Sequence, residues 1–206
     1  LKAQGFWVRG VDIKEPEYEP SLADEFWIKD LRNYDSCVAS VSGINDVYNL
    51  AADMGGIGYI TAYHALLTRN NILINSHMLE SARLQGVNRY LYTSSACVYP
   101  SFFQDDADVT PLREEQSVPA DPEKGYGWEK LFAEQLTTYY HEEWGLDVRI
   151  VRFHNIYGPL GTFEGGKEKA PAGPPKSGPV EARGCRSTEK GTDGPLLLRD
   201  GGQAAG

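Results

Sequence analysis

The sequence predicts an α/β fold built on a doubly wound parallel sheet. Short β-prone runs alternate along the chain with segments in which apolar residues recur at helical spacing. Glycines such as Gly86 and Gly145 follow two of these helical segments, at the positions where helices commonly end. Strands that alternate with helices are typical of βαβ units and mostly parallel sheets, which bind ligands beyond the carboxyl ends of their strands.

Five segments are expected to be strands because they are rich in β-branched or aromatic residues and end at acidic or turn-forming residues. In chain order they are Phe6–Ile13, Glu25–Ile28, Asp46–Ala51, Arg89–Ser95 and Asp147–Phe153.

Three segments are expected to be helices: Leu31–Ser42, Ile60–Gln85 and Gly127–Trp144. The second carries its apolar residues at helical spacing over its whole length, and the third is amphipathic. The segment Gly173–Gly206 is rich in glycine, proline and charge and shows no sustained period. We expect it to be disordered, because it offers too little apolar surface to offset the entropy of ordering.

Composition excludes several classes of function. The 206 residues carry a net charge of −9, which argues against general binding of nucleic acid or of anionic membranes. No apolar run is long enough to span a membrane, and no signal peptide is recognisable. The 3 cysteines are widely spaced and the histidines are scattered, so we expect neither a disulfide framework nor a metal site, and a reducing cytoplasm is the default.

Tyr126 and Lys130 are four residues apart at a helix start, so they share a helix face. A nearby ammonium stabilises a phenolate, and we therefore expect Lys130 to lower the pKa of Tyr126 toward the range of a general base. The alternative is a chance pair on a solvated face. The strand that ends at Ser95 favours a site, because its hydroxyl would point into the ligand crevice.

Five stretches together resemble the GDP-mannose 3,5-epimerase family, within the extended short-chain dehydrogenase/reductases that act on nucleotide sugars. They are NLAADMGGIGYI (49–60), TSSACVYP (93–100), YGWEK (126–130), RFHNIYGP (152–159) and EKAPA (168–172). The resemblance covers residues 1 to about 172 and implies a Rossmann-type fold, NAD as cofactor and a nucleotide-sugar substrate of the GDP-mannose type.

The resemblance also implies roles for the catalytic residues. Ser95 and Tyr126 match the residues that contact the reacting hydroxyl, and Lys130 matches the lysine that holds the nicotinamide ribose. Cys97 matches the base and Lys169 the acid that exchange the C3 and C5 protons after transient oxidation at C4. A cysteine with a lowered pKa is a competent base. The alternatives are a buried, inert Cys97 and a solvated Lys169, with Lys167 as a competing acid.

The same resemblance implies the binding residues. The expected cofactor contacts are Asp12, Asp30, Ala51, Ala52, Tyr126 and Lys130, although Asp12 and Asp30 could instead be turn residues. The expected substrate contacts are Gly55, Ser95, Cys97, Asn155, Glu168, Lys169 and Ala170.

We expect residues 1–158 to form an incomplete NAD-binding domain, 159–172 to begin a substrate-binding region and 173–206 to be a tail unlike the family. The chain lacks a glycine-rich GxGxxG turn and the first strand before it, so a fragment is expected. Two alternatives stay open: a C4 epimerase or 4,6-dehydratase of the same superfamily, and an inactive nucleotide-binding fragment. A homodimer formed through the helix that carries Tyr126 and the neighbouring helix Ile60–Gln85 is also expected from the resemblance.

Overall fold

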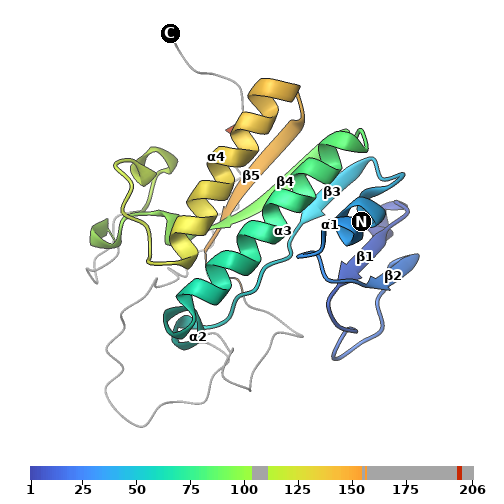
Figure 1. Cartoon of the computed structure of the whole chain (residues 1–206), viewed down its shortest axis with the longest axis horizontal. Helices are drawn as coiled ribbons and strands as arrows, with labels where there is room; N and C mark the ends of the chain where they lie inside the picture. The colour runs from blue at the N-terminus through green and yellow to red at the C-terminus, as the bar shows by residue number, and fades with distance from the viewer. Residues whose placement is uncertain (104–110, 155, 157–198, 201–206) are drawn as a thin grey trace.

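The computed structural model of the chain describes residues 1–103, 111–154, 156 and 199–200 (Figure 1). It is an α/β structure in which strands and helices alternate along the chain, as predicted. The strands are β1 (Arg9–Asp12), β2 (Glu25–Ile28), β3 (Asp46–Asn49), β4 (Arg89–Ser95), β5 (Asp147–Phe153) and β6 (Arg199–Asp200). The α-helices are α1 (Tyr34–Val41), α2 (Ile57–Ala62), α3 (His64–Leu84) and α4 (Tyr126–Trp144). The 3₁₀ helices are η1 (Lys2–Gln4), η2 (Ala96–Val98), η3 (Ser101–Phe103) and η4 (Glu114–Ser117).

The strands form two sheets, where the sequence led us to expect one. β1 pairs with β2 in parallel, and the second sheet has the order β3-β4-β5-β6, with β6 antiparallel. Within the described residues no ladder joins the two sheets. β6 belongs to the segment that we expected to be disordered; the rest of that segment lies outside the described residues.

The central ladder brings the ends of β3 and β4 to one edge. β4 pairs with β5 over its full length, from Arg89 opposite Asp147 to Ser95 opposite Phe153. β3 pairs with the first half of β4, so Asn49 lies opposite Tyr92. Because all three strands run in the same direction, the segments after Asn49 and Ser95 leave the sheet at the same end.

The helices α1, α3 and α4 lie in a row, with α3 in the middle, and α3 and α4 run alongside the strands of the larger sheet (Figure 1). The predicted helix over residues 60–85 is broken into α2 and α3 at Tyr63, whose backbone is not helical (φ −126°, ψ 40°). The apolar spacing continues across the break, which is why periodicity did not reveal it. No helix in the described part of the chain is both long and apolar enough to cross a membrane.

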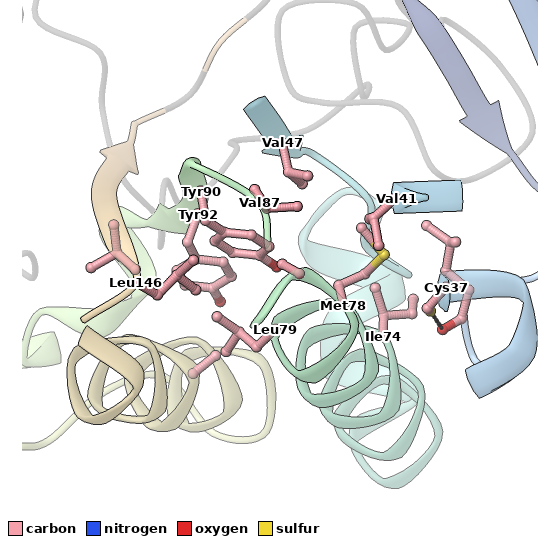
Figure 2. Close-up of a cluster of buried hydrophobic side chains, with 14 residues drawn as sticks. Cys37, Val41, Val47, Ile74, Met78, Leu79, Val87, Tyr90, Tyr92 and Leu146 are labelled. Atoms are coloured by element: carbon pink, nitrogen blue, oxygen red, sulfur yellow. Dashed lines mark hydrogen bonds between the residues drawn. The ribbon is translucent and has the colours of Figure 1, made fainter. Parts of the chain in front are cut away.

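The main hydrophobic core lies between the larger sheet and this helical row (Figure 2). Tyr90 and Tyr92 of β4 are buried in this core, to which α1, α3 and α4 all contribute side chains. Cys37 belongs to this core: it is fully buried, and its thiol donates a hydrogen bond to the Leu31 carbonyl at 3.0 Å. Burial raises the pKa of the Cys37 thiol to about 12, so Cys37 is a packing residue.

Candidate active site

The turn that follows β4 places Ser95 and Cys97 beside each other. Ser95 ends the strand and caps η2, where its hydroxyl oxygen accepts a hydrogen bond from the Cys97 backbone N–H at 3.2 Å. The Cys97 side chain is partly exposed and packs against a small apolar cluster that contains Ile60, Leu67 and Tyr126. Cys97 therefore differs from the fully buried Cys37 in the exposure of its thiol.

Tyr126 is the first residue of α4 and is brought to Cys97 by close backbone packing. Gly125, which precedes it, has a left-handed φ of 79°, and Gly127 follows. A Cβ placed on Gly127 would overlap the Cys97 carbonyl oxygen, so only glycine permits this approach without a shift. The same carbonyl accepts a hydrogen bond from the Glu123 N–H at 3.0 Å.

Burial raises the pKa of Tyr126 above its usual value, and the charges of Glu129 and Cys97 act in the same direction. A hydrogen bond with Ser95 acts in the opposite direction, but it is the weaker effect. The expected lowering of the Tyr126 pKa by Lys130 is therefore wrong for this structure, because the sequence did not reveal how deeply the phenol is buried.

Lys130 lies one turn further along α4 and is 2% exposed. Its ammonium donates a hydrogen bond to the Thr93 carbonyl at 2.9 Å and lies 5.6 Å from the centre of the Tyr126 ring. Burial lowers the Lys130 pKa, and the carboxylate of Glu129 opposes this. Tyr126 and Lys130 thus share a buried face, and the alternative of a solvated pair is wrong.

Sequence reasoning missed a buried carboxylate between these two residues. Glu129 is 1% exposed and accepts hydrogen bonds from Asn71 Nδ2 at 2.9 Å and Asn75 Nδ2 at 3.3 Å. Burial raises the pKa of Glu129 to about 7. The signal was present in the sequence, since Glu129 occupies a core-facing position of α4 beside Lys130, and Asn71 and Asn75 stand four residues apart on α3.

The segment after β3 carries the expected cofactor residues Ala51 and Ala52, and both are partly buried. Ala51 packs against the main core. Asp53 is held on three sides: its backbone N–H donates to Asn71 Oδ1 at 2.7 Å, and its carboxylate accepts from Asn70 and Tyr59. Gly55 lies close to the Tyr59 side chain, which a Cβ would approach to 3.0 Å.

Asp12 and Asp30 lie at the carboxyl end of the smaller sheet, Asp12 as the last residue of β1 and Asp30 shortly after β2. Each also acts as a turn residue: Asp12 accepts from the Lys14 N–H, and Asp30 from the Arg32 N–H at 2.9 Å. Arg32 forms an ion pair with Asp30 at 2.6 Å and lowers its pKa. The structure thus gives both acids a local structural role.

Asn155, Glu168, Lys169 and Ala170, together with the competing Lys167, lie outside the described residues. The described parts of the chain hold no group of three or more His, Cys, Asp or Glu side chains arranged for a metal ion.

Several known proteins are similar to this chain in sequence and in fold. A family model described as the NAD dependent epimerase/dehydratase family matches residues 1–172. GDP-mannose 3,5-epimerase of Arabidopsis thaliana is 42% identical over 203 residues, which is 98% of this chain and 51% of that protein. The chain therefore spans about half the length of this curated relative. The family match ends at the expected boundary of Ala172, whereas the pairwise alignment continues past it.

Two solved structures illustrate the likeness of fold. UDP-glucose 4-epimerase of Thermus thermophilus, a complex with NAD, has a TM-score of 0.69 at 22% identity, covering 80% of this chain and 52% of that one. A double mutant of the dTDP-glucose 4,6-dehydratase DesIV of Streptomyces venezuelae, with NAD bound, has a TM-score of 0.58 at 26% identity, covering 66% of this chain and 40% of that one.

Proposed function

This chain belongs to the NAD dependent epimerase/dehydratase family, and we propose that it carries the catalytic half of a nucleotide-sugar epimerase of the GDP-mannose 3,5-epimerase type. The observation that carries the proposal is the close approach of a partly exposed Cys97 to Tyr126 at the carboxyl edge of the larger sheet. A thiol beside the residues that handle the sugar hydroxyl supplies a second proton-transfer group, which an epimerisation at carbon needs.

The proposed cofactor is NAD, which would act as a reversible hydride acceptor for C4 of the sugar. Lys130 would hold the nicotinamide ribose, with Ala51 and Ala52 beside the cofactor and Asp12 and Asp30 at its adenosine end. The ionised Asp30 suits the last role, because a carboxylate accepts hydrogen bonds from ribose hydroxyls. The proposed contacts follow the carboxyl edges of both sheets.

In the proposed chemistry, Tyr126, Cys97 and Lys169 each transfer one proton. The positive charge of the nicotinamide ring of bound NAD would favour the Tyr126 phenolate, which would then take the proton of the C4 hydroxyl as the hydride leaves C4, with Ser95 bonded to the same oxygen. The resulting ketone acidifies the C–H bonds at C3 and C5, and the Cys97 thiolate removes one of these protons. Lys169 delivers a proton to the opposite face of that carbon. Return of the hydride to C4 and of the proton from Tyr126 to its oxygen would restore the alcohol with no net oxidation, and proton exchange with water would return Cys97 to the thiolate and Lys169 to the ammonium.

Incorporation of deuterium from D₂O at C3 and C5 of GDP-mannose, in the presence of NAD, tests this function. We expect incorporation with the wild-type chain, none with Cys97→Ala, and retention with the control Cys37→Ser, which changes the core thiol. Equal incorporation in Cys97→Ala would show that Cys97 is not the base. Absence of incorporation in the wild-type chain would favour the inactive fragment.

The same samples distinguish the proposed 3,5-epimerase from a C4 epimerase or a 4,6-dehydratase. Neither alternative predicts loss of deuterium incorporation in Cys97→Ala. A dehydratase of this superfamily is expected to carry an Asp-Glu pair after the serines, where this chain has Ala96-Cys97. Mass spectrometry of the product decides between the reactions, because dehydration removes the mass of one water and epimerisation leaves the mass unchanged apart from deuterium.

We propose a homodimer as the working assembly. The outer face of α4 exposes Trp128, Phe132 and Tyr139 at helical spacing, each about half exposed, and the neighbouring α3 exposes Leu66. Aromatic residues in such a stripe favour association with a second, identical surface. Sedimentation velocity should show a dimer that Phe132→Glu converts to a monomer, whereas a monomeric wild-type chain would contradict the assembly. A reducing compartment such as the cytoplasm is proposed because the two described cysteines, Cys37 and Cys97, form no disulfide.

A further inference from the structure

Glu129 is a buried charged residue that the proposed chemistry does not use. It lies on α4 between Tyr126 and Lys130, and its two carboxylate oxygens accept hydrogen bonds from two amide side chains of α3. A carboxylate that is 1% exposed is costly to keep in a core, and it is retained only where hydrogen bonds and a countercharge compensate. Lys130 supplies the countercharge, and Asn71 and Asn75 supply the hydrogen bonds.

The amide of Asn71 joins Glu129 to the backbone of Asp53. Its Nδ2 donates to Glu129 Oε1 at 2.9 Å and to the Asp53 carbonyl at 3.0 Å. Its Oδ1 accepts from the Asp53 N–H at 2.7 Å. One fully buried side chain therefore binds both backbone groups of Asp53 and is itself fixed by a carboxylate of a different helix.

Asn75 repeats the connection one turn further along α3. Its Nδ2 donates to Glu129 Oε2, and its Oδ1 accepts from Asn49 Nδ2 at 3.1 Å. Asn49 is the last residue of β3. The two amides thus connect Glu129 to the end of β3 and to the segment that follows it, which has no regular secondary structure until α2.

We propose that Glu129 is a positioning residue that sets the segment Ala51–Asp53 relative to the first turn of α4. Ionised Glu129 orients the Asn71 amide so that its remaining donor and its acceptor meet Asp53. The expected consequence rests on the proposed function: the cofactor-facing alanines and the pair Tyr126 and Lys130 keep a fixed separation only while this connection is intact. Glu129 itself touches neither cofactor nor substrate in this proposal.

Exchange of the Asp53 amide hydrogen at pH 8 tests the connection, using the full chain without ligand. In Glu129→Gln the side-chain NH2 group of the new glutamine faces the NH2 group of one of the two asparagines, and neither group can accept a hydrogen bond. We therefore expect the Asp53 amide to exchange about 10-fold faster, which corresponds to the loss of one hydrogen bond. The double variant Asn75→Asp with Glu129→Gln exchanges donor and acceptor, because the new glutamine can donate to the new aspartate and still accept from Asn71, which keeps both of its bonds to Asp53. The double variant should move Asp53 exchange back toward the wild-type rate.

A matched control separates this effect from general destabilisation. Glu134→Gln removes another buried carboxylate of α4, which pairs with Arg152 of β5. It should leave Asp53 exchange at the wild-type rate relative to amides of β4. An unchanged Asp53 rate in Glu129→Gln, an equal change in Glu134→Gln, or no recovery in the double variant would each overturn the proposal.

Calorimetric titration with NAD tests the consequence for the cofactor. We expect Glu129→Gln to weaken NAD binding several-fold and the double variant to recover part of the loss. Equal affinity in the wild-type chain and Glu129→Gln would overturn the positioning role. If no form binds NAD, the proposed function fails, and the exchange measurement alone decides the inference.

Discussion

At the scale of the single residue, the raised pKa of Glu129 makes stability depend on pH. The Glu129 pKa rises from 4.5 to about 7 on folding because burial outweighs Lys130 and the two asparagines. The native state therefore holds this proton more tightly than the unfolded chain does, and its contribution to stability is largest below about pH 4.5 and is lost as pH rises toward 7. At about 1.4 kcal/mol per pKa unit, the loss is about 3 kcal/mol.

Urea unfolding of the wild-type chain and Glu129→Gln at pH 5 and pH 8 measures this contribution. Because the glutamine of the variant does not titrate, the wild-type chain should gain on the variant by about 2.5 kcal/mol when pH is lowered from 8 to 5. Comparison of the two chains removes the titration of all other groups. A stability difference that is the same at both values of pH would contradict the raised pKa.

Gly127 should be intolerant of a side chain, because a Cβ at this position would overlap the Cys97 carbonyl oxygen. We expect Gly127→Ala to lower the free energy of unfolding by about 1–3 kcal/mol, the usual cost of overpacking, and to displace Cys97 from Tyr126. Gly58→Ala is the matched control: Gly58 is also the second residue of a helix, and a Cβ there meets nothing within 4 Å.

Two quantities are measured for each glycine variant. They are the free energy of unfolding in urea and the rate at which Cys97 is alkylated, which is determined by peptide mass spectrometry. Gly58→Ala should match the wild-type chain in both. An alkylation rate in Gly127→Ala equal to that of the wild-type chain would show that the close approach does not position Cys97.

The limits of sequence reasoning at this scale follow from burial. The types and spacing of Ser95, Tyr126 and Lys130 predicted that these residues meet, because chain order and parallel strands fix which strand ends lie together, whereas Cys97 was singled out only by the family resemblance. The direction of the Tyr126 pKa was wrong because desolvation depends on packing from other elements. The partners of Glu129 were missed for the same reason, since α3 and α4 are far apart in sequence.

At the scale of the element, one arginine joins β5 to two other parts of the structure. Arg152 pairs with Glu134 of α4 at 2.7 Å and donates to the Glu114 carbonyl at 2.8 Å and to Ser117 at 3.2 Å, both in η4. Because the ion pair is largely buried, Arg152→Lys, which keeps the charge but not all of these bonds, should cost about 1.5–3 kcal/mol in urea unfolding.

Arg83→Lys is the control for that cost. Arg83 pairs with Glu80 through the same two-bond geometry, but both side chains are about one third exposed. The loss of this two-bond geometry in Arg83→Lys should lower the free energy of unfolding by at most about 1 kcal/mol. Limited proteolysis should also cut near η4 sooner in Arg152→Lys than in Arg83→Lys, and equal cutting would argue against Arg152 as the anchor of η4.

Element boundaries were predictable where local signals are strong. β4 and β5 begin and end at the predicted residues, because acidic or turn-forming residues flank runs of β-prone residues. The strand expected over Phe6–Ile13 is shorter, with β1 limited to Arg9–Asp12, because strand ends depend on the partner: β1 pairs only with the four residues of β2. The break at Tyr63 leaves no signal in the apolar spacing.

At the scale of the whole molecule, pairing between strands was the part that sequence predicted least well. Alternation of strands and helices predicts an α/β class and parallel pairing, but no local pattern states that β3 follows β2 in the chain without pairing to it. The expected cofactor residues are therefore divided between two sheets, with Asp12 and Asp30 on one and Ala51, Ala52 and Lys130 beside the other.

Thermal unfolding with NAD tests whether these two sheets act as one binding surface. A ligand that binds only the native state at about 100 times its Kd stabilises it by about 2.7 kcal/mol, which for a chain of this size raises Tm by about 5–10 °C. We expect this shift in the wild-type chain and a smaller one in Asp30→Asn, which loses the carboxylate after β2. Asp24→Asn, which changes the acid just before the same strand, should keep the full shift. If Asp30→Asn and Asp24→Asn show equal shifts in Tm, the smaller sheet does not bind NAD through Asp30. If the shift is reduced in Asp30→Asn alone, both sheets contribute to one cofactor site.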